Sequence, residues 1–321
     1  MSIINKMSNN LTIHLLVNET AGNGRAKKVL EQTALLLVNE NIDFDIQKST
    51  YPGEAIILAE TYCNQKHHKN EVLLVIGGDG SFNEVLNGIK RSNKPETPCA
   101  YLPAGTGNDF GRAAHLTSNP QVLLDHLKAN LKPSSIDCGS FKLAEFGKQT
   151  FYFVNSFGIG FDAYVNHLSN ISTLKKMLNR INEGKLIYGS HILTCLRKQD
   201  TFTVEVECDG KKRYYQNAFL VTTTNHPYLG GGIALLPPAR IDSHKINTVI
   251  VEKYTIKSLI KLFIKLLKDG SHLECPEFHY IEAEQITVKT SKQEFGQVDG
   301  EEIKRGNFNI DFVVDQFDLL R

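Results

Sequence analysis

Two glycine-rich loops constrain the fold of this chain most strongly, because each begins where a short apolar run ends. Residues 77–81 read Gly-Gly-Asp-Gly-Ser and follow the run 72–76, and residues 103–109 read Pro-Ala-Gly-Thr-Gly-Asn-Asp and follow the run 100–102. Glycines at such places let the backbone approach a ligand closely and direct its N–H groups at it. Each loop also carries a carboxylate, so the pair predicts a cradle for a polyphosphate and its metal ion.

The residues around these loops alternate predicted strands with predicted helices. Residues 13–17 read as a buried strand, helical spacing of apolar residues follows from residue 26, and an apolar stripe recurs at helical spacing over 82–89. Such alternation is typical of a parallel sheet covered on both faces. Ligands of these folds bind at the carboxyl ends of the strands, where both glycine loops fall.

Beyond residue 133 the pattern changes to short strands separated by turns. The segments that read as strands are 136–141, 150–155, 202–208, 214–223, 248–252, 286–289 and 308–314. Two helical stretches interrupt them, at 173–196 and 256–267. We therefore expect an α/β domain over residues 11–133 and a mostly antiparallel, β-rich domain, a sandwich or an open barrel, over residues 134–307.

Composition argues against several classes of protein. A net charge of +1 provides no global field that would attract nucleic acid. The six cysteines contain no C-x-x-C pair, which favours free thiols in a reducing cytoplasm over a zinc site or a disulfide framework. No apolar run approaches the roughly 18 residues that span a bilayer, and residues 1–10 lack a signal-peptide core. We expect a cytoplasmic protein that remains able to contact a membrane surface.

The ordered set of motifs resembles the lipid kinase family of the soluble bacterial diacylglycerol kinases, whose catalytic domain is shared by eukaryotic diacylglycerol, sphingosine and ceramide kinases. Further segments that resemble the family are 18–24, 50–55, 158–163, 230–242 and 298–301. The resemblance covers nearly the whole chain. It implies an α/β nucleotide-binding domain similar to phosphofructokinase, a β-rich lipid-substrate domain, and a C-terminal segment, about 308–321, that returns to the first domain.

The resemblance also implies ATP and Mg²⁺ as cofactors. Asp79, Asp109 and Asp137 match three acidic residues that hold the catalytic magnesium in bacterial members, partly through water. Hard oxygen ligands of this kind suit a magnesium ion that bridges phosphates. Without the resemblance, Asp79 and Asp109 are equally turn formers or helix N-caps, and Asp137 is an ordinary strand residue.

Nucleotide binding is expected from residues of the loops and their flanks. The candidates are Asn18, Thr50, Gly78, Asp79, Gly80, Gly105, Thr106, Asn108 and Arg112. Ordinary turn chemistry is the alternative for the polar loop residues, and a surface salt bridge is the alternative for Arg112. The predicted catalytic residues are Asp79 and Glu301; the latter matches the residue proposed as general base in the bacterial enzymes. Alternatively, residues 299–300 form a hairpin turn that leaves Glu301 merely exposed.

Two basic amphipathic stretches suggest contact with anionic lipid, one with Lys175, Lys176 and Arg180 and the other over residues 256–268. A core-packed helix with a solvated lysine face is the commoner arrangement, but the family counterpart of the first stretch lies near the lipid entrance. One departure from the family pattern matters: Ser243 stands where some members have an aspartate that ligates a structural magnesium. Such a second metal near Asp242 is therefore in doubt.

Together these features predict an ATP- and magnesium-dependent lipid kinase, with diacylglycerol as the favoured substrate and phosphatidic acid as the product. A kinase for another lipid alcohol (a sphingoid base, monoacylglycerol or prenyl alcohol) and a non-catalytic nucleotide- or lipid-binding regulator are the alternatives. NAD kinase is disfavoured by the second loop and the motifs of the second domain. We expect the protein on the inner face of the membrane, peripherally bound, with a lipid substrate as partner, no nucleic acid, and a homodimer as one oligomeric state, because relatives are often dimers.

Overall fold

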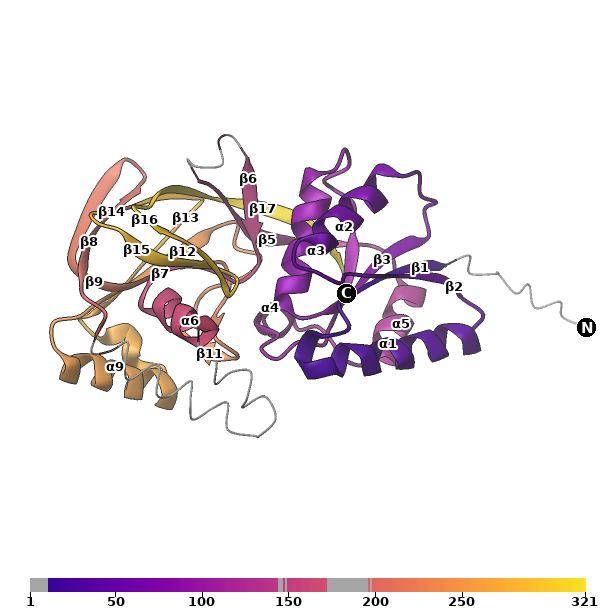
Figure 1. The fold of residues 1–321 in the computed structure, drawn as a ribbon, viewed down its shortest axis with the longest axis horizontal. Coiled ribbons are helices and arrows are strands. Elements are labelled where there is room, and N and C mark those ends of the chain that lie inside the picture. The colour runs from indigo at the N-terminus through magenta and orange to yellow at the C-terminus, as the bar shows by residue number, and fades with distance from the viewer. Residues whose placement is uncertain (1–10, 144–146, 148, 172–195, 197) are drawn as a thin grey trace, which may run out of the picture. The chain divides into compact units, whose positions relative to one another are not determined.

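The computed structural model describes residues 11–143, 147, 149–171, 196 and 198–321. The chain divides into two compact units (Figure 1). Unit 1 comprises residues 1–136 together with 316–321, and unit 2 comprises residues 137–315. Within the described residues, no helix combines the length and the apolar character needed to cross a bilayer.

Unit 1 is built on a parallel sheet whose strands follow the order β2, β1, β3, β4. The strands are β1 (Thr12–Val17), β2 (Asp43–Lys48), β3 (Glu71–Gly77) and β4 (Cys99–Pro103). The helices are α1 (Ala21–Asn39), α2 (Glu54–Asn64), α3 (Asp79–Arg91), α4 (Asp109–Ala113) and α5 (Pro120–Ala129). Figure 1 shows α1 and α5 on one face of the sheet and α2 and α3 on the other.

Alternation along β1 explains how both faces are covered. Ile13, Leu15 and Val17 are buried in the core shared with α1 and α5. His14 and Leu16 point to the other face, because successive side chains of a strand alternate. The apolar stripe of α3 is buried as its spacing predicts, with Phe82, Val85, Leu86 and Ile89 at most 1% exposed. The α/β fold predicted for this part of the chain is confirmed.

Unit 2 is rich in antiparallel strands, as predicted. Its strands are β5 (Ser134–Lys142), β6 (Thr150–Phe153), β7 (Ser156–Gly160), β8 (Phe202–Cys208), β9 (Lys211–Thr224), β10 (Tyr228–Leu229), β11 (Ile233–Ala234), β12 (Ile246–Glu252), β13 (Phe278–Ala283), β14 (Gln285–Thr290), β15 (Glu294–Val298), β16 (Glu301–Gly306) and β17 (Asn309–Leu320). The order β16-β15-β7-β9-β8-β14 forms a sheet, and β12 lies between β9 and β13. Unit 2 also contains the helices α6 (Phe161–Ile171) and α9 (Ile256–Lys268) and the short 3-10 helix η2 (Ser271–Glu274).

The long strand β17 belongs to both units. Its residues Asn309 to Val313 pair with β14, whereas Leu319 and Leu320 pair in parallel with β4. The segment that returns to the first unit therefore begins at Gln316 and not near residue 308, because residues 308–315 take part in the sheet of unit 2. The first boundary falls after Ile136, close to the expected change at residue 133.

Other expectations for the second domain had mixed outcomes. The helix expected at 256–267 is present as α9, and it ends one residue later. The helical stretch expected at 173–196, with Lys175, Lys176 and Arg180, lies outside the described residues apart from Leu196. No strong sequence pattern predicted β7, β13, β15 and β16, which are five or six residues long. Strands β7 and β15 are mostly buried, whereas β13 and β16 lie at edges of the sheet and are partly or wholly exposed, so the four strands share no single burial pattern.

Candidate functional site

The two glycine loops of unit 1 touch each other backbone to backbone. A Cβ atom on Gly105 would lie 2.4 Å from the Cα atom of Gly78, closer than real Cβ contacts allow. The backbone N–H of Ala104 donates a 2.7 Å hydrogen bond to the carbonyl of Gly77. The ends of β3 and β4 are thus joined at a place where only glycine fits.

Asn108 closes the second loop. It adopts a left-handed conformation with φ of 52°, and its Oδ1 accepts a 2.9 Å hydrogen bond from the N–H of Gly105. Its Nδ2 donates back to the carbonyl of Gly105 at 3.2 Å. The Asn108 side chain therefore holds the loop in place, which is the turn chemistry expected of asparagine.

Asp79 and Asp109 are brought together directly. Each is the first residue of its helix, α3 and α4 respectively, and the N–H of Asp109 donates a 2.8 Å hydrogen bond to Oδ2 of Asp79. Oδ1 of Asp109 forms a 2.7 Å ion pair with Arg112, whose Nη2 also lies 3.4 Å from the carbonyl of Gly107. Both carboxylates stand in the first turn of a helix, where the helix dipole favours a negative charge.

A third strand end joins the two loops. Asn18, directly after β1, donates through Nδ2 to the hydroxyl of Ser81 at 3.2 Å. Residues 22–24 that follow are all left-handed, and a Cβ atom on Gly22 would lie 2.2 Å from the carbonyl oxygen of Ala104. Arg25 donates to that same carbonyl at 3.2 Å. Residues from the ends of β1, β3 and β4 thus converge as the alternating pattern predicts.

Space is left open beside these contacts. A Cβ atom on Gly80 would meet no atom within 4 Å, and both Gly80 and Thr106 are exposed. Thr50 lies in another environment, because its hydroxyl donates a 2.8 Å hydrogen bond to Glu54. Hydrogen bonds from Thr50 lower the pKa of the Glu54 carboxyl. Thr50 therefore acts at the start of α2, and its predicted contact with a nucleotide stays a prediction.

Glu84 has a structural role that the sequence did not reveal. Its carboxylate, on α3, accepts hydrogen bonds from the backbone N–H groups of Gly53 at 2.8 Å and Ala55 at 3.3 Å. These N–H groups lie at the start of α2, where helices have unsatisfied donors. Glu84 thereby ties α2 to α3; its place just after the first glycine loop was the signal available in the sequence.

Stacked aromatic rings pack between the helices that follow the two loops and the strand β4. Phe82 of α3 stacks on Tyr101 with ring centroids 4.5 Å apart and on Phe110 of α4 at 5.0 Å. Phe317 of β17 lies 5.9 Å from Phe110. The hydroxyl of Tyr101 donates to the carbonyl of Gly77 at 3.3 Å, and burial raises its pKa well above the ordinary value. These rigid contacts fix the positions of α3 and α4, and with them Asp79 and Asp109.

Asp137, the third predicted metal ligand, lies in unit 2. Its buried carboxylate accepts a 2.6 Å hydrogen bond from the N–H of His244, and its Oδ1 lies 3.1 Å from Nδ1 of the same residue. His244 was not singled out from the sequence, because 107 residues separate it from Asp137. The structure joins Asp79 to Asp109, and a metal site that also includes Asp137 stays a prediction.

The loop that lacks the family aspartate is held by other contacts. Arg240 forms a bidentate ion pair with Asp242, at 2.9 and 3.1 Å. The hydroxyl of Ser243 donates to the carbonyl of Arg240 at 3.2 Å. An arginine is therefore the partner of the Asp242 carboxylate in this loop.

Glu301 follows a two-residue hairpin turn between β15 and β16. Asp299 and Gly300 have φ of 48° and 87°, and Glu301 pairs with Val298. Glu301 is exposed. The Asp299 carboxylate accepts backbone hydrogen bonds from residues 154, 155 and 156, at 2.9, 2.9 and 2.8 Å. The hairpin that the sequence offered as an alternative is thus present, firmly anchored, and presents Glu301 to solvent; its catalytic role stays a prediction.

A buried network supports this turn. Gln297 accepts the N–H of Gly300 at 2.7 Å and donates to Oδ2 of Asp162 at 3.2 Å. Thr222 donates to the same oxygen at 3.3 Å. Burial raises the pKa of Asp162 to about 6, although hydrogen bonds from Gln297 and Thr222 oppose the shift. Asp162 stands in one of the segments that resemble the family, but the sequence assigned it no role.

Comparison with known proteins gives consistent matches over both units. The family model described as "Diacylglycerol kinase catalytic domain" matches residues 12–141, and "YegS C-terminal NAD kinase beta sandwich-like domain" matches residues 155–316, just over half of the chain. "Putative lipid kinase YtlR" of Bacillus subtilis is 28% identical over 89% of this chain and 92% of its own length. "Diacylglycerol kinase" of Staphylococcus carnosus is 28% identical over 89% of this chain and 87% of its own length. The structure titled "Crystal structure of a putative diacylglycerol kinase", from Bacillus anthracis, has a TM-score of 0.73 at 22% identity, over 100% of this chain and 98% of that one, and so shares the fold.

Proposed function

Because this chain belongs to the lipid kinase family that carries the diacylglycerol kinase catalytic domain, we propose that it transfers the γ-phosphate of ATP to a lipid hydroxyl, with diacylglycerol as substrate and phosphatidic acid as product. The contact of Gly78 with Gly105 carries this proposal, because it joins two strand ends whose N–H groups can face phosphate oxygens. Diacylglycerol is favoured over other lipid alcohols because the Staphylococcus carnosus relative is a diacylglycerol kinase.

The residues of unit 1 fit a nucleotide with a divalent cation. Asp79 and Asp109 offer hard oxygen atoms that lie within one hydrogen-bonded arrangement, and the space beside Gly80 is open. Both aspartates would hold the ion, for which we propose Mg²⁺ together with Asp137. When bound, such an ion neutralises charge on the phosphates as the phosphoryl group moves.

The chain's own side chains contribute positioning and charge. Arg112 lies beside Asp109 and is 42% exposed, so its guanidinium can bind a phosphate oxygen as well as the carboxylate. Asn18, Thr106 and Asn108 orient the loops around the phosphates. Glu301 accepts the proton of the lipid hydroxyl; the anchored Asp299–Gly300 turn supports this role by fixing the backbone from which Glu301 projects.

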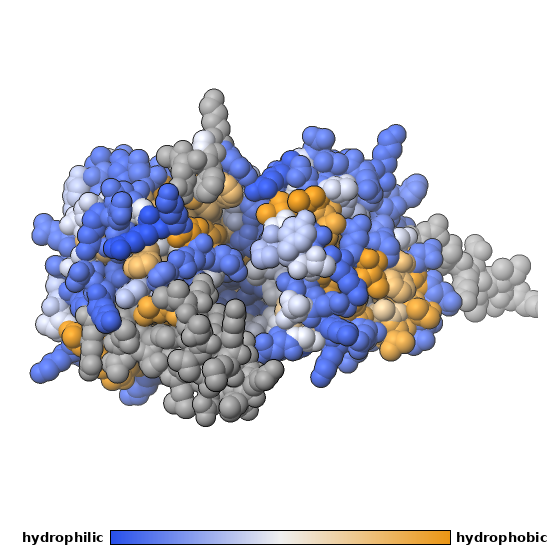
Figure 2. Space-filling view, viewed as in Figure 1, coloured by the Kyte–Doolittle hydropathy of each residue, from blue (hydrophilic) through white to orange (hydrophobic). Residues whose placement is uncertain are grey.

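The helix α9 supports a membrane-bound location. Its apolar residues Ile256, Ile260, Ile264 and Leu267 are 44–70% exposed and recur at i, i+4, i+8 and i+11, so they lie on one face. A lysine follows each of them directly, at positions 257, 261, 265 and 268. Figure 2 shows a mainly hydrophilic surface with apolar patches, some of them at the lower left where α9 lies.

An exposed apolar strip flanked by lysines matches a membrane surface that contains anionic lipid. The apolar side chains insert among acyl chains, and the ammonium groups attract the headgroups. We therefore propose peripheral attachment through α9 to the inner face of the membrane, where the lipid substrate resides. A homodimer remains a proposal that rests on the family alone.

The identity of the product tests this function. Purified protein is incubated with radiolabelled ATP and a membrane lipid extract, and the labelled lipid is identified by chromatography and mass spectrometry. Labelled phosphatidic acid supports the proposal, and a different labelled lipid assigns another acceptor alcohol. Binding of ATP with no labelled lipid would instead favour a non-catalytic regulator. In the same assay, Asp79→Asn tests the proposed phosphate and metal site. Asp43→Asn, at an exposed position, is its matched control.

A further inference from the structure

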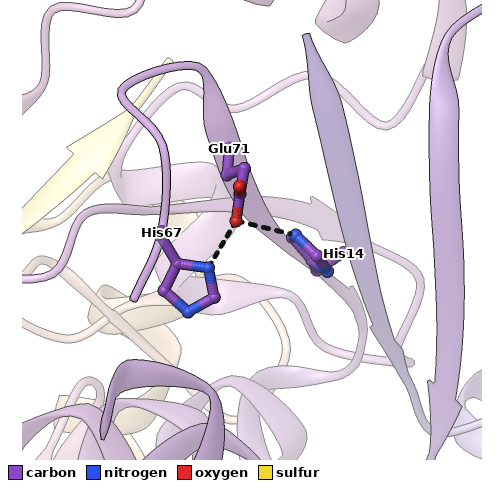
Figure 3. Close-up of side chains that lie close together, drawn as sticks. All are labelled: His14, His67 and Glu71. Carbon is purple, nitrogen blue, oxygen red and sulfur yellow. Dashed lines mark hydrogen bonds and ion pairs between the residues drawn. The ribbon is translucent and has the colours of Figure 1, made fainter. Parts of the chain in front are cut away.

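A cluster of two histidines and one carboxylate lies away from the glycine loops. His14 comes from β1, Glu71 begins β3, and His67 lies in the loop between α2 and β3 (Figure 3). One ligand atom from each lies within 4.8 Å of the others. Glu71 precedes Gly77 by six residues of strand, about 20 Å at roughly 3.3 Å per residue. The cluster therefore occupies the amino ends of the strands, at the opposite edge of the sheet from the loops.

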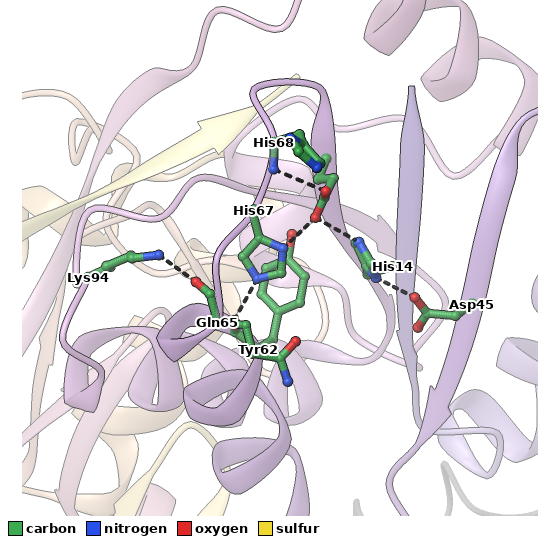
Figure 4. Close-up of polar contacts among 8 residues, drawn as sticks. His14, Asp45, Tyr62, Gln65, His67, His68 and Lys94 are labelled. Atoms are coloured by element: carbon green, nitrogen blue, oxygen red, sulfur yellow. Dashed lines mark hydrogen bonds and ion pairs between the residues drawn. The ribbon is translucent and has the colours of Figure 1, made fainter. Parts of the chain in front are cut away.

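Every ring nitrogen in the cluster faces an oxygen atom. Nε2 of His14 lies 3.3 Å from Oε2 of Glu71, and Nδ1 of His67 lies 2.5 Å from the same oxygen. The other nitrogen of His14 contacts Asp45, and Nε2 of His67 lies 2.6 Å from the carbonyl of Tyr62 (Figure 4). A neutral imidazole donates only one N–H. When the outer contacts take those donors, the two inner nitrogens direct lone pairs at an anionic oxygen.

Such a convergence of lone pairs is satisfied by a cation. Histidines that bind metals usually donate their other N–H to a carboxylate or a backbone carbonyl, which fixes the tautomer and the orientation of the ring. Asp45 and the carbonyl of Tyr62 are outer partners of these two kinds. One divalent ion also balances the two negative charges of Glu71 and Asp45, so neither carboxylate is left uncompensated.

The three side chains are already held in place. The ring of Tyr62 stacks on His67 with centroids 3.9 Å apart, and the N–H of His68 donates to Oε1 of Glu71 at 3.0 Å. The side chains of His14, His67 and Glu71 are 21%, 16% and 15% exposed, so an ion can reach them from solvent.

The geometry points to a structural site for a divalent transition metal, formed by Nε2 of His14, Nδ1 of His67 and Oε2 of Glu71. Two imidazoles and a carboxylate suit Zn²⁺, which leaves the fourth tetrahedral position to water. The ion would join β1, β3 and the loop after α2, and would stabilise unit 1 because it binds the folded chain. Its distance from the glycine loops separates it from the proposed phosphoryl transfer.

Metal binding by the intact, chelator-stripped protein tests this inference. Isothermal titration with ZnCl₂ measures affinity and stoichiometry, and the melting temperature is recorded with and without the metal. We expect one equivalent to bind and the melting temperature to rise by several degrees. His67→Ala and Glu71→Gln should each weaken the affinity at least tenfold, and Asp45→Asn, which alters an outer partner, by roughly 10- to 100-fold. The matched control is His68→Ala, since His68 is exposed and reaches Glu71 through its backbone N–H.

Co²⁺ provides a second readout that needs no variant. Coordination of Co²⁺ by nitrogen and oxygen atoms gives visible d–d absorption without the sulfur charge-transfer bands of a cysteine site, and Zn²⁺ should displace it. The inference is overturned if the wild-type protein binds neither ion, if bound Co²⁺ shows sulfur charge transfer, or if His67→Ala and His68→Ala bind Zn²⁺ equally well.

Discussion

The Cα atom of Gly78 lies so close to Gly105 that a Cβ atom on the latter would come within 2.4 Å of it. This contact joins the ends of β3 and β4 without any side chain between them. It brings the first residues of α3 and α4, Asp79 and Asp109, into one hydrogen-bonded arrangement. The site proposed for the nucleotide depends on that contact more than on any single polar group.

Replacement of Gly105 by alanine should therefore disturb both stability and activity. The new methyl group must displace the backbone of Gly78, which we expect to cost about 1–3 kcal/mol of unfolding free energy. Thermal or urea unfolding measures the loss, and kinase assays should show a parallel loss of turnover. An alanine variant with the stability and turnover of the wild type would contradict the close packing of the loops.

Gly80→Ala tests for ligand binding at a place where the added methyl group does not disturb the packing of the protein. A Cβ atom there meets no atom of the chain within 4 Å, and alanine favours a helix over glycine by about 0.5–1 kcal/mol. We expect unchanged or slightly higher stability but weaker ATP binding, because the methyl group enters the space proposed for the phosphates. Calorimetric titration with ATP checks this; wild-type affinity would place the phosphates elsewhere.

Glu301→Gln tests the proposed proton acceptor. The amide keeps the shape of the side chain but cannot take a proton, and general bases typically contribute 10²- to 10⁴-fold. We expect kcat to fall by at least 100-fold while the KM for ATP changes little. The neighbouring Glu302, which pairs with His167 at 2.6 Å, changed to Gln, is the control and should retain turnover. Equal rates for the two variants would remove Glu301 from the mechanism.

The exposed strip of α9 should control binding to vesicles. Changing Ile264 and Leu267, which are 58% and 70% exposed, to Gln removes apolar groups from the proposed membrane contact. We expect roughly tenfold or greater loss of binding to vesicles that contain phosphatidylglycerol, because two apolar side chains can no longer be buried in the membrane. Sedimentation with vesicles measures it, and Leu35→Gln, at a 65% exposed position of α1, should bind normally. Equal binding by the α9 variant and the wild type would assign the membrane contact to another surface.

Asp162 should make unfolding depend on pH in a defined window. Its folded pKa, about 6, lies above the ordinary value of 3.8, so between these values the folded chain binds more protons than the unfolded chain. The free energy of unfolding should therefore fall as pH rises from about 4 to about 6, by on the order of 3 kcal/mol, and this decline should be absent in Asp162→Asn.

Urea unfolding at a series of pH values measures that difference. The exposed Asp43, changed to Asn, serves as the control and should keep the wild-type decline. If Asp162→Asn and the wild type differ by a constant amount from pH 4 to pH 7, the carboxyl does not titrate in this window.

Short-range patterns account for what the sequence predicted well. The stripe from Phe82 to Ile89 and the glycines after two apolar runs are local signals, and they placed the parallel sheet and the loops at its carboxyl edge. Long-range pairings gave no such signal. His244 meets Asp137 across 107 residues, and His14 meets Glu71 across 57, because the register of distant strands brings them together.

Strand β17 shows the same limit at the level of domains. One continuous run of twelve residues pairs first with β14 and then with β4, so no change of composition marks the boundary at Gln316. Likewise, the identities of Asp299 and Gly300 predicted a turn. The three backbone N–H groups that donate to Asp299 could not be predicted, because they belong to residues 154–156, far away in the sequence.

Transfer of labelled phosphate to diacylglycerol by the wild-type protein, Asp79→Asn and Asp43→Asn tests the central claim most directly. With radiolabelled ATP, Mg²⁺ and diacylglycerol in mixed micelles, we expect labelled phosphatidic acid from the wild type and from Asp43→Asn. Asp79→Asn should give a signal at background. Equal labelling by Asp79→Asn and the wild type would contradict the assignment of the phosphate and metal site to the glycine loops.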